Sequence, residues 1–118
     1  MVILQGEIYW VDLDEPQGSE PGYTRPYVII QNNLSNQSRL NTVLLCALTS
    51  NTKRGQDAGN VTLNTGEAGP SKQSIVVVSQ LVTLDKTQLG DYIGALSKSR
   101  VRQILDGIQL LTEPRDLE

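Results

Sequence analysis

Short apolar runs separated by polar loops occupy most of this sequence, and their length constrains the fold more than any other feature. The runs are rich in β-branched and aliphatic residues, and polar segments containing glycine, proline, asparagine or serine separate them. That pattern is typical of strands rather than helices. The sequence therefore predicts five to seven short, mostly antiparallel strands and one C-terminal helix, in the α+β or mainly-β class.

Individual segments differ in how strongly they indicate a strand. Residues 42–48 are almost continuously apolar, as in a strand buried on both faces, and Cys46 within them is expected in the core. The polar pair Ser79 and Gln80 interrupts the apolar segment 74–84 and predicts a bend or a functional surface position. The predicted strands are 7–13, 25–31, 42–48, 61–63, 74–84 and 92–96.

The C-terminal helix is predicted over residues 97–111. Ser97 is a suitable N-cap, and Leu96 and Val101 are spaced as a hydrophobic staple. Leu110 falls roughly opposite the apolar stripe, so we expect it to be exposed, where it could face a partner chain. The stripe itself consists of Val101, Ile104, Leu105, Ile108 and Leu111.

The composition excludes several classes of site. The 118 residues suffice for one core, so we expect a single domain over 1–118. The chain has no histidine and one cysteine, which removes the commonest neutral-pH proton shuttle and excludes an internal disulfide. We expect no metal and no cofactor.

Residues 1–5 lack the basic and apolar features of a secretory signal, and no apolar run has the length of a membrane span, so a cytoplasmic location is expected.

Charge is distributed unevenly along the chain, although the net charge is only -3. Residues 1–20 contain five acidic residues and no basic one, whereas residues 21–80 contain five basic residues and two acidic ones. An acidic chain is a poor non-specific binder of nucleic acid. A local basic patch in the middle of the chain could still bind a phosphate backbone.

Two loops carry the residues that could perform chemistry. Arg25 lies where the long segment 14–24 rejoins a predicted strand, and Pro26 favours an extended backbone at Arg25. Thr49 and Ser50 directly follow the apolar run 42–48. Taken singly, each is better explained as an ordinary surface arginine or a turn-forming hydroxyl.

Taken in their order and spacing, these segments resemble the MazF/PemK family of toxin endoribonucleases from toxin–antitoxin pairs. The resemblance implies a small SH3-like antiparallel β-barrel with a C-terminal helix. It further implies a homodimer that cuts single-stranded RNA at short sequences without a metal, restrained by a cognate, MazE-like antitoxin whose disordered tail covers the RNA groove. The segments that carry the resemblance are 6–13, 18–20, 25–26, 48–50, 79–80, 84–86 and 93–96.

The resemblance also implies which residues are catalytic, namely Arg25 and Thr49, with Glu20 at the position of the family's usual glutamate. RNA supplies its own nucleophile, the 2′-OH. The planar guanidinium matches phosphate oxygens, so Arg25 suits charge stabilisation, to which donation of a proton to the leaving group could be added. It is not the candidate base, because a guanidinium is protonated before the reaction begins. Glu20 is the candidate base, with a hydroxyl network or water as the alternative.

Further residues are candidates for RNA binding. Lys53 and Arg54 lie in the loop after Thr49 and could extend a positive surface, although a solvated loop is an equal interpretation. Gln80 could read a base edge or satisfy backbone groups at a bulge. Trp10 or its neighbour Tyr9 could stack on bases, and at least one of them is expected in the core. Ser19 and Ser50 complete the predicted RNA-binding set.

Two alternative functions compete with the endoribonuclease. A non-catalytic CcdB-like toxin that inhibits DNA gyrase would have a related barrel but no active arginine–threonine pair. A small SH3-like binding module without toxicity is the third possibility. The placement of Arg25 and Thr49 favours the endoribonuclease.

Overall fold

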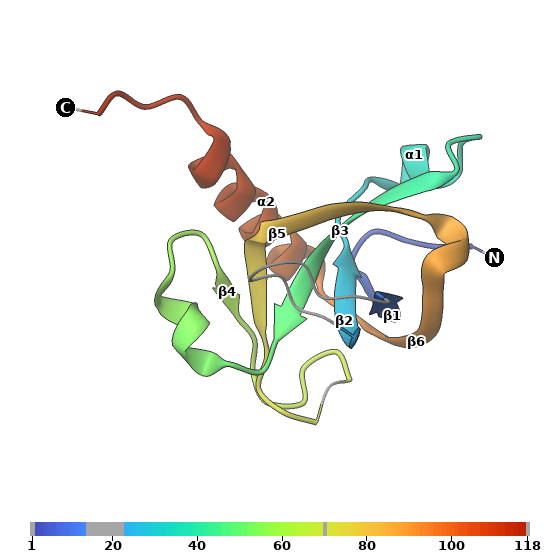
Figure 1. Cartoon of the computed structure of the whole chain (residues 1–118), viewed down its shortest axis with the longest axis horizontal. Helices are drawn as coiled ribbons and strands as arrows, with labels where there is room; N and C mark the ends of the chain where they lie inside the picture. Colours follow the sequence, from blue (N-terminus) through green and yellow to red (C-terminus); the bar gives the residue numbers. More distant parts are fainter. Residues whose placement is uncertain (1, 14–22, 70, 118) are drawn as a thin grey trace.

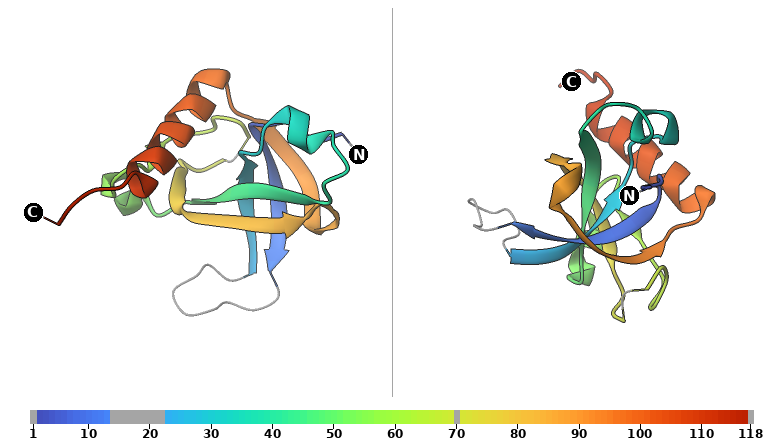
Figure 2. Two further views of the ribbon diagram at one scale, coloured as in Figure 1. Left: turned by 90° about the horizontal axis from the view of Figure 1, so that it is seen from above. Right: turned by 90° about the vertical axis from the view of Figure 1, so that its right-hand side faces the viewer.

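The computed structural model describes residues 2–13, 23–69 and 71–117. A curled antiparallel sheet makes up the body of the molecule, and the C-terminal helix α2 lies across one of its faces (Figures 1 and 2). The elements in chain order are β1 (Glu7–Leu13), β2 (Tyr23–Ile29), α1 (Asn33–Asn36), β3 (Thr42–Thr49), the 3-10 turn η1 (Thr52–Gln56), β4 (Val61–Thr62), β5 (Ile75–Asp85), the 3-10 turn η2 (Lys86–Gln88), β6 (Leu89–Ala95) and α2 (Lys98–Thr112).

The six strands form one sheet in the order β4-β5-β3-β2-β1-β6, and neighbouring strands are antiparallel. The first and last strands of this order do not pair with each other within the described residues, so the sheet curls without closing into a complete barrel. The predicted class, a small antiparallel β structure with a C-terminal helix, is confirmed.

The bend predicted at Ser79 and Gln80 is present in the structure. Cys46 of β3 pairs with Leu81 of β5, whereas the next residue of β3, Ala47, pairs with Val77. The residues between these two pairs form a bulge in β5. Bulges bend a strand and increase its twist, so this one helps the sheet to curl.

The sheet buries apolar side chains on both faces. Strand β3 contributes to both cores, with Cys46 and Leu48 on the side covered by α2 and Leu45 and Ala47 on the other side. This placement confirms the prediction that β3 is buried on both faces. Burial raises the pKa of the Cys46 thiol to about 12, so the thiol stays protonated at neutral pH.

Helix α2 begins where the sequence predicts. The Ser97 side chain accepts a hydrogen bond of 3.2 Å from the backbone N–H of Arg100 and caps the helix. Gly107, a weak helix former, has a packing role, because a Cβ there would overlap the carbonyl group of Gly59. Leu110 is 39% exposed, as expected, whereas Leu111, which was predicted as part of the apolar stripe, is 46% exposed. Within the described residues, no helix has the length and apolar content needed to cross a membrane.

Candidate active site

Arg25 lies near the start of β2, and its side chain reaches across to the end of β3. Its Nε and Nη2 atoms donate hydrogen bonds of 3.2 and 2.7 Å to the backbone carbonyl oxygen of Leu48. Because Leu48 directly precedes Thr49, this contact holds the guanidinium near Thr49, the other predicted catalytic residue. The remaining N–H groups of the guanidinium have no hydrogen-bond partner among the residues that the structure describes, so they can donate to a ligand.

The charge of Arg25 is not neutralised by an ion pair with any described carboxylate. Burial lowers the pKa of Arg25, the nearby Tyr27 raises it, and the positive charge of Arg54 lowers it further. A half-buried cation next to a second cation attracts an anion. A phosphate bound here would relieve both the desolvation of the guanidinium and the repulsion between the two arginines.

Thr49 is the last residue of β3, and its hydroxyl belongs to a turn. The Oγ1 atom accepts a hydrogen bond of 3.2 Å from the backbone N–H of Asn51. That bond uses the oxygen as an acceptor, so the hydroxyl proton can still be donated to a phosphate oxygen. The hydroxyl thus stabilises the turn and remains available for a ligand. Ser50 follows at the exposed start of the loop.

Arg25, Thr49 and Ser50 line a single cleft with a volume of about 620 Å³. Two residues that the sequence did not single out as site residues, Lys72 and Tyr92, line it too. Lys72 adds a second positive charge to the walls. The structure thus brings a guanidinium, an ammonium group and two hydroxyls to one surface, a combination suited to a phosphodiester.

Aromatic surface borders the same cleft. Trp10 is 42% exposed and Tyr92 is 55% exposed, whereas Tyr9 is buried. The expectation that at least one of Tyr9 and Trp10 lies in the core is therefore confirmed. The rings of Tyr9 and Tyr92 make an edge-to-face contact with centroids 5.7 Å apart, which supports the position of Tyr92. Trp10 and Tyr92 offer flat faces on which nucleobases could stack.

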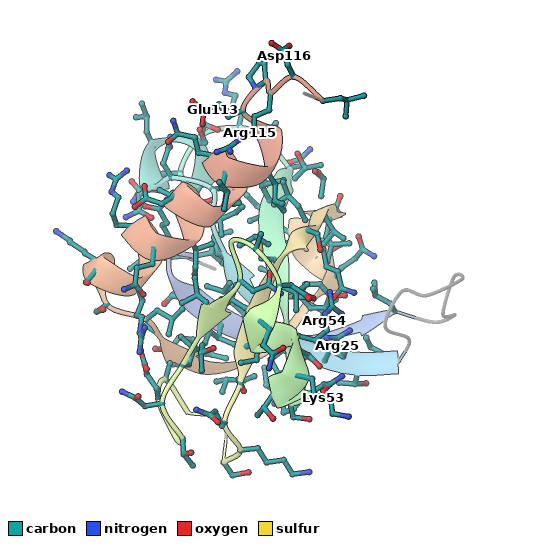
Figure 3. All side chains as sticks on the ribbon, turned by 90° about the vertical axis from the view of Figure 1, so that its left-hand side faces the viewer. Arg25, Lys53, Arg54, Glu113, Arg115 and Asp116 are labelled. Carbon is teal, nitrogen blue, oxygen red and sulfur yellow. The ribbon has the colours of Figure 1, made fainter. Side chains whose placement is uncertain are left out.

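Three predicted RNA-binding residues, Lys53, Arg54 and Gln80, are not among the residues that line the cleft. Lys53 and Arg54 belong to η1, and Figure 3 shows them on the same side of the molecule as Arg25. Arg54 Nε forms an ion pair of 2.7 Å with Asp57 Oδ2. Gln80 lies in the bulge of β5, where its Oε1 atom is buried and lacks a hydrogen-bond partner among the described residues.

Two predicted residues, Ser19 and Glu20, lie outside the described residues. Across the parts of the chain that are described, no group of three or more histidine, cysteine, aspartate or glutamate side chains could hold a metal ion. Lys72 is one of the five basic residues of segment 21–80, but no motif distinguishes it as a site residue. Tyr92 could have been noticed as a large aromatic residue in a predicted strand, but its position in the cleft depends on tertiary structure.

Comparison with known proteins places this arrangement in a family. Residues 4–112 match the family described as PemK-like, MazF-like toxin of type II toxin-antitoxin system. Endoribonuclease MazF6 of Mycobacterium tuberculosis is 40% identical over 109 residues, covering 92% of this chain and 96% of the relative. Endoribonuclease MazF of Staphylococcus saprophyticus is 31% identical over 109 residues, covering 92% of this chain and 90% of the relative.

A solved structure supports the fold independently. An endoribonuclease in complex with its cognate antitoxin, from a mycobacterial species, superposes with a TM-score of 0.70 at 24% identity and covers 98% of both chains. Family match, relatives and shared architecture agree over almost the whole length. The chain therefore belongs to the PemK-like, MazF-like toxins of type II toxin–antitoxin systems.

Proposed function

We propose that this toxin is a metal-independent, sequence-specific endoribonuclease that cleaves single-stranded RNA by attack of a ribose 2′-OH on the adjacent phosphate. The observation that carries the proposal is the convergence of Arg25 and Thr49 on one cleft, with the guanidinium oriented by the Leu48 carbonyl oxygen. RNA contains its own nucleophile, so the protein has to position the phosphate, stabilise its charge and assist two proton transfers.

Arg25 has the main electrostatic role. Its free N–H groups donate to the non-bridging oxygens of the scissile phosphate, whose negative charge grows as the 2′ oxygen attacks. The hydroxyl of Thr49 donates to the same phosphate, and Lys72 binds a neighbouring one. The contact with Leu48 uses a neutral acceptor, so it orients the guanidinium without cancelling its charge.

The proton transfers follow from acidity. Burial and the charge of Arg54 lower the pKa of Arg25, which makes its guanidinium a stronger acid and a suitable proton donor to the leaving 5′ oxygen. A guanidinium that is protonated when the reaction begins has no lone pair to accept the proton of the 2′-OH, so it cannot also serve as the base. We assign the base to Glu20, with a bound water as the alternative.

The endoribonuclease is favoured over gyrase inhibition for two reasons. The relatives matched at 31–40% identity carry endoribonuclease names. The cleft also combines cations, hydroxyls and exposed aromatic rings, which suits single-stranded RNA. We further propose that the toxin forms a homodimer in the cytoplasm. A cognate, MazE-like antitoxin would inhibit it by covering this positive cleft with an acidic segment.

The decisive experiment is incubation of the purified toxin with a long single-stranded RNA in excess EDTA. We expect discrete cuts that leave 2′,3′-cyclic phosphate and 5′-hydroxyl ends, because attack by the 2′-OH produces that pair of ends. A parallel preparation of Arg25→Ala controls for contaminating nucleases. Cleavage that requires a divalent metal, or intact RNA together with inhibition of gyrase supercoiling, would contradict the proposal.

A further inference from the structure

A second hollow adjoins the cleft that contains Arg25. Its volume is about 600 Å³, and it shares Trp10 and Thr24 with the first cleft. The rest of its described lining is Asp12, Gly90 and Asp91. We call this second hollow the acidic lobe. One exposed indole ring thus lies on the border between a cation-lined cleft and a carboxylate-lined hollow.

An irregular strand pairing builds the acidic lobe. Tyr9 of β1 pairs with Tyr92 of β6, but two residues further along β1, Val11 pairs with Leu89. Gly90 and Asp91 therefore both lie opposite Trp10, which is a β-bulge. Bulges redirect side chains and are common beside active sites.

The close approach of the two strands requires a small residue in this bulge. A Cβ on Gly90 would lie 2.8 Å from the backbone carbonyl oxygen of Trp10. Within the bulge, Gly90 leaves the base of the hollow free of a side chain, and the neighbouring Asp91 contributes a carboxylate to its lining. On β1, Asp12 supplies the second carboxylate of the lobe.

The two hollows have opposite chemistry. Arg25 and Lys72 line the first, whereas Asp12 and Asp91 line the second. Neither aspartate has an ion pair or a hydrogen bond through its side chain with another described residue. Carboxylates repel phosphates but accept hydrogen bonds from N–H groups. On an RNA strand, those donors belong to the bases.

We propose that the acidic lobe receives a base next to the scissile phosphate and selects bases with an exocyclic amino group over uracil. The base stacks on Trp10, and its amino group donates to Asp12 or Asp91. Cytosine offers an amino donor where uracil has a carbonyl acceptor, which a carboxylate repels. The inference deepens the proposed function, because it assigns part of the sequence preference of the same site.

The test uses short oligomers of deoxycytidine and deoxyuridine. They lack the 2′-OH and cannot be cut, so binding is measured apart from cleavage. Trp10 is the only tryptophan of the chain, and quenching of its fluorescence reports occupancy next to the lobe. We expect the cytidine oligomer to bind about tenfold more tightly than the uridine oligomer.

Substitutions in the lobe identify the group responsible. Asp12→Asn, Asp91→Asn and the double variant should reduce the ratio of the two affinities towards one, because a carboxamide can also donate to the carbonyl of uracil. Asp106→Asn removes the same charge from an exposed position on α2 and should leave the ratio unchanged. Two results would overturn the proposal. One is equal affinity of the wild type for the two oligomers. The other is a rise by the same factor in the affinity of the lobe variants for both oligomers, with the ratio unchanged.

The outcome separates the two proposals. If wild-type toxin cuts RNA but binds both oligomers equally, the acidic lobe is rejected and the endoribonuclease stands. If the oligomer ratio holds but no RNA is cut, the endoribonuclease is rejected and the base selectivity of the lobe stands. Binding of basic peptides by the lobe, with no preference between the oligomers, would also reject the selectivity.

Discussion

Two arginines of this molecule, Arg25 in the cleft and Arg100 on α2, differ in the charge of their hydrogen-bond partners. The guanidinium of Arg25 donates to the neutral carbonyl oxygen of Leu48. Arg100 binds Glu67 through two hydrogen bonds, 2.9 Å from Nε and 3.1 Å from Nη2. The first contact orients a charge and leaves it available, whereas the second neutralises a charge and ties the loop before β5 to the helix. Comparing the partners thus separates a guanidinium suited to binding a ligand from one that fastens the fold.

Replacing Arg25 should give the largest effect. Arg25→Ala removes the group that stabilises the phosphate, and we expect cleavage to fall by about 10³-fold, as for the loss of a main oxyanion donor. Stability should change by about 1 kcal/mol, because one carbonyl loses its partner. Single-turnover cleavage and thermal unfolding measure the two quantities. A folded Arg25→Ala protein with normal turnover would eliminate the assigned role.

Removing the Thr49 hydroxyl should be the next largest effect. Thr49→Val keeps the shape of the side chain but deletes the donor, and we expect a loss of about 10²-fold in the cleavage rate. Thr49→Ser retains the hydroxyl and should preserve most of the activity. Equal losses in both variants would show that the methyl group, rather than the hydroxyl, matters at this position.

Lys72 and Lys53 form a matched pair for comparison, because Lys72 lines the cleft and Lys53 does not. Lys72→Ala should weaken RNA binding by roughly fivefold to tenfold and reduce the salt dependence of binding by about one phosphate contact. Lys53→Ala should have a smaller effect on both. Binding isotherms at several salt concentrations provide the measurement, and a larger effect at Lys53 would reverse the assignment.

Arg100→Ala should affect stability rather than chemistry, with the smallest effect on cleavage. We expect a loss of about 1 kcal/mol near neutral pH, since the ion pair is only partly exposed. The hydrogen bond from Arg100 lowers the pKa of Glu67. The stabilisation is therefore complete above the pKa of Glu67 in the unfolded chain and is lost as the pH falls through the lower pKa in the folded protein.

Denaturant unfolding of the wild type and Arg100→Ala at neutral and acidic pH checks that prediction. The difference in stability between the two proteins should shrink as the solution becomes acidic. A difference that stays constant with pH would mean that Arg100 acts through packing of its aliphatic stem. Unchanged cleavage by the folded variant would keep the two arginines functionally distinct.

Local sequence patterns determined much of the fold but little of the site. Strand β1 matches its prediction of 7–13, because its apolar and aromatic residues alternate with the pleat. Strand β6 begins at Leu89, earlier than the predicted residue 92. The prediction started too late because Gly90 and Asp91 disfavour strands locally. In the structure a bulge against β1 accommodates both residues within the strand.

The residues of the site differ in how far the sequence could predict them. The catalytic roles of Arg25 and Thr49 were assigned through the family resemblance, since neither has a local pattern that separates it from an ordinary loop residue. Lys72 and Tyr92 were not identified as site residues, because they reach the cleft from segments distant in sequence from Arg25. Sequence periodicity predicts which face of an element is buried, but it does not predict which loops meet in space.

The shielded Cys46 side chain has a practical consequence for studies of motion in this toxin. A thiol that stays protonated in the core reacts slowly with maleimides and other electrophilic dyes, and it is the only cysteine of the chain. A cysteine introduced on the surface would therefore be labelled selectively without first replacing the native one. Fluorophores or spin labels placed in this way would report distances and rearrangements while the core keeps its native packing.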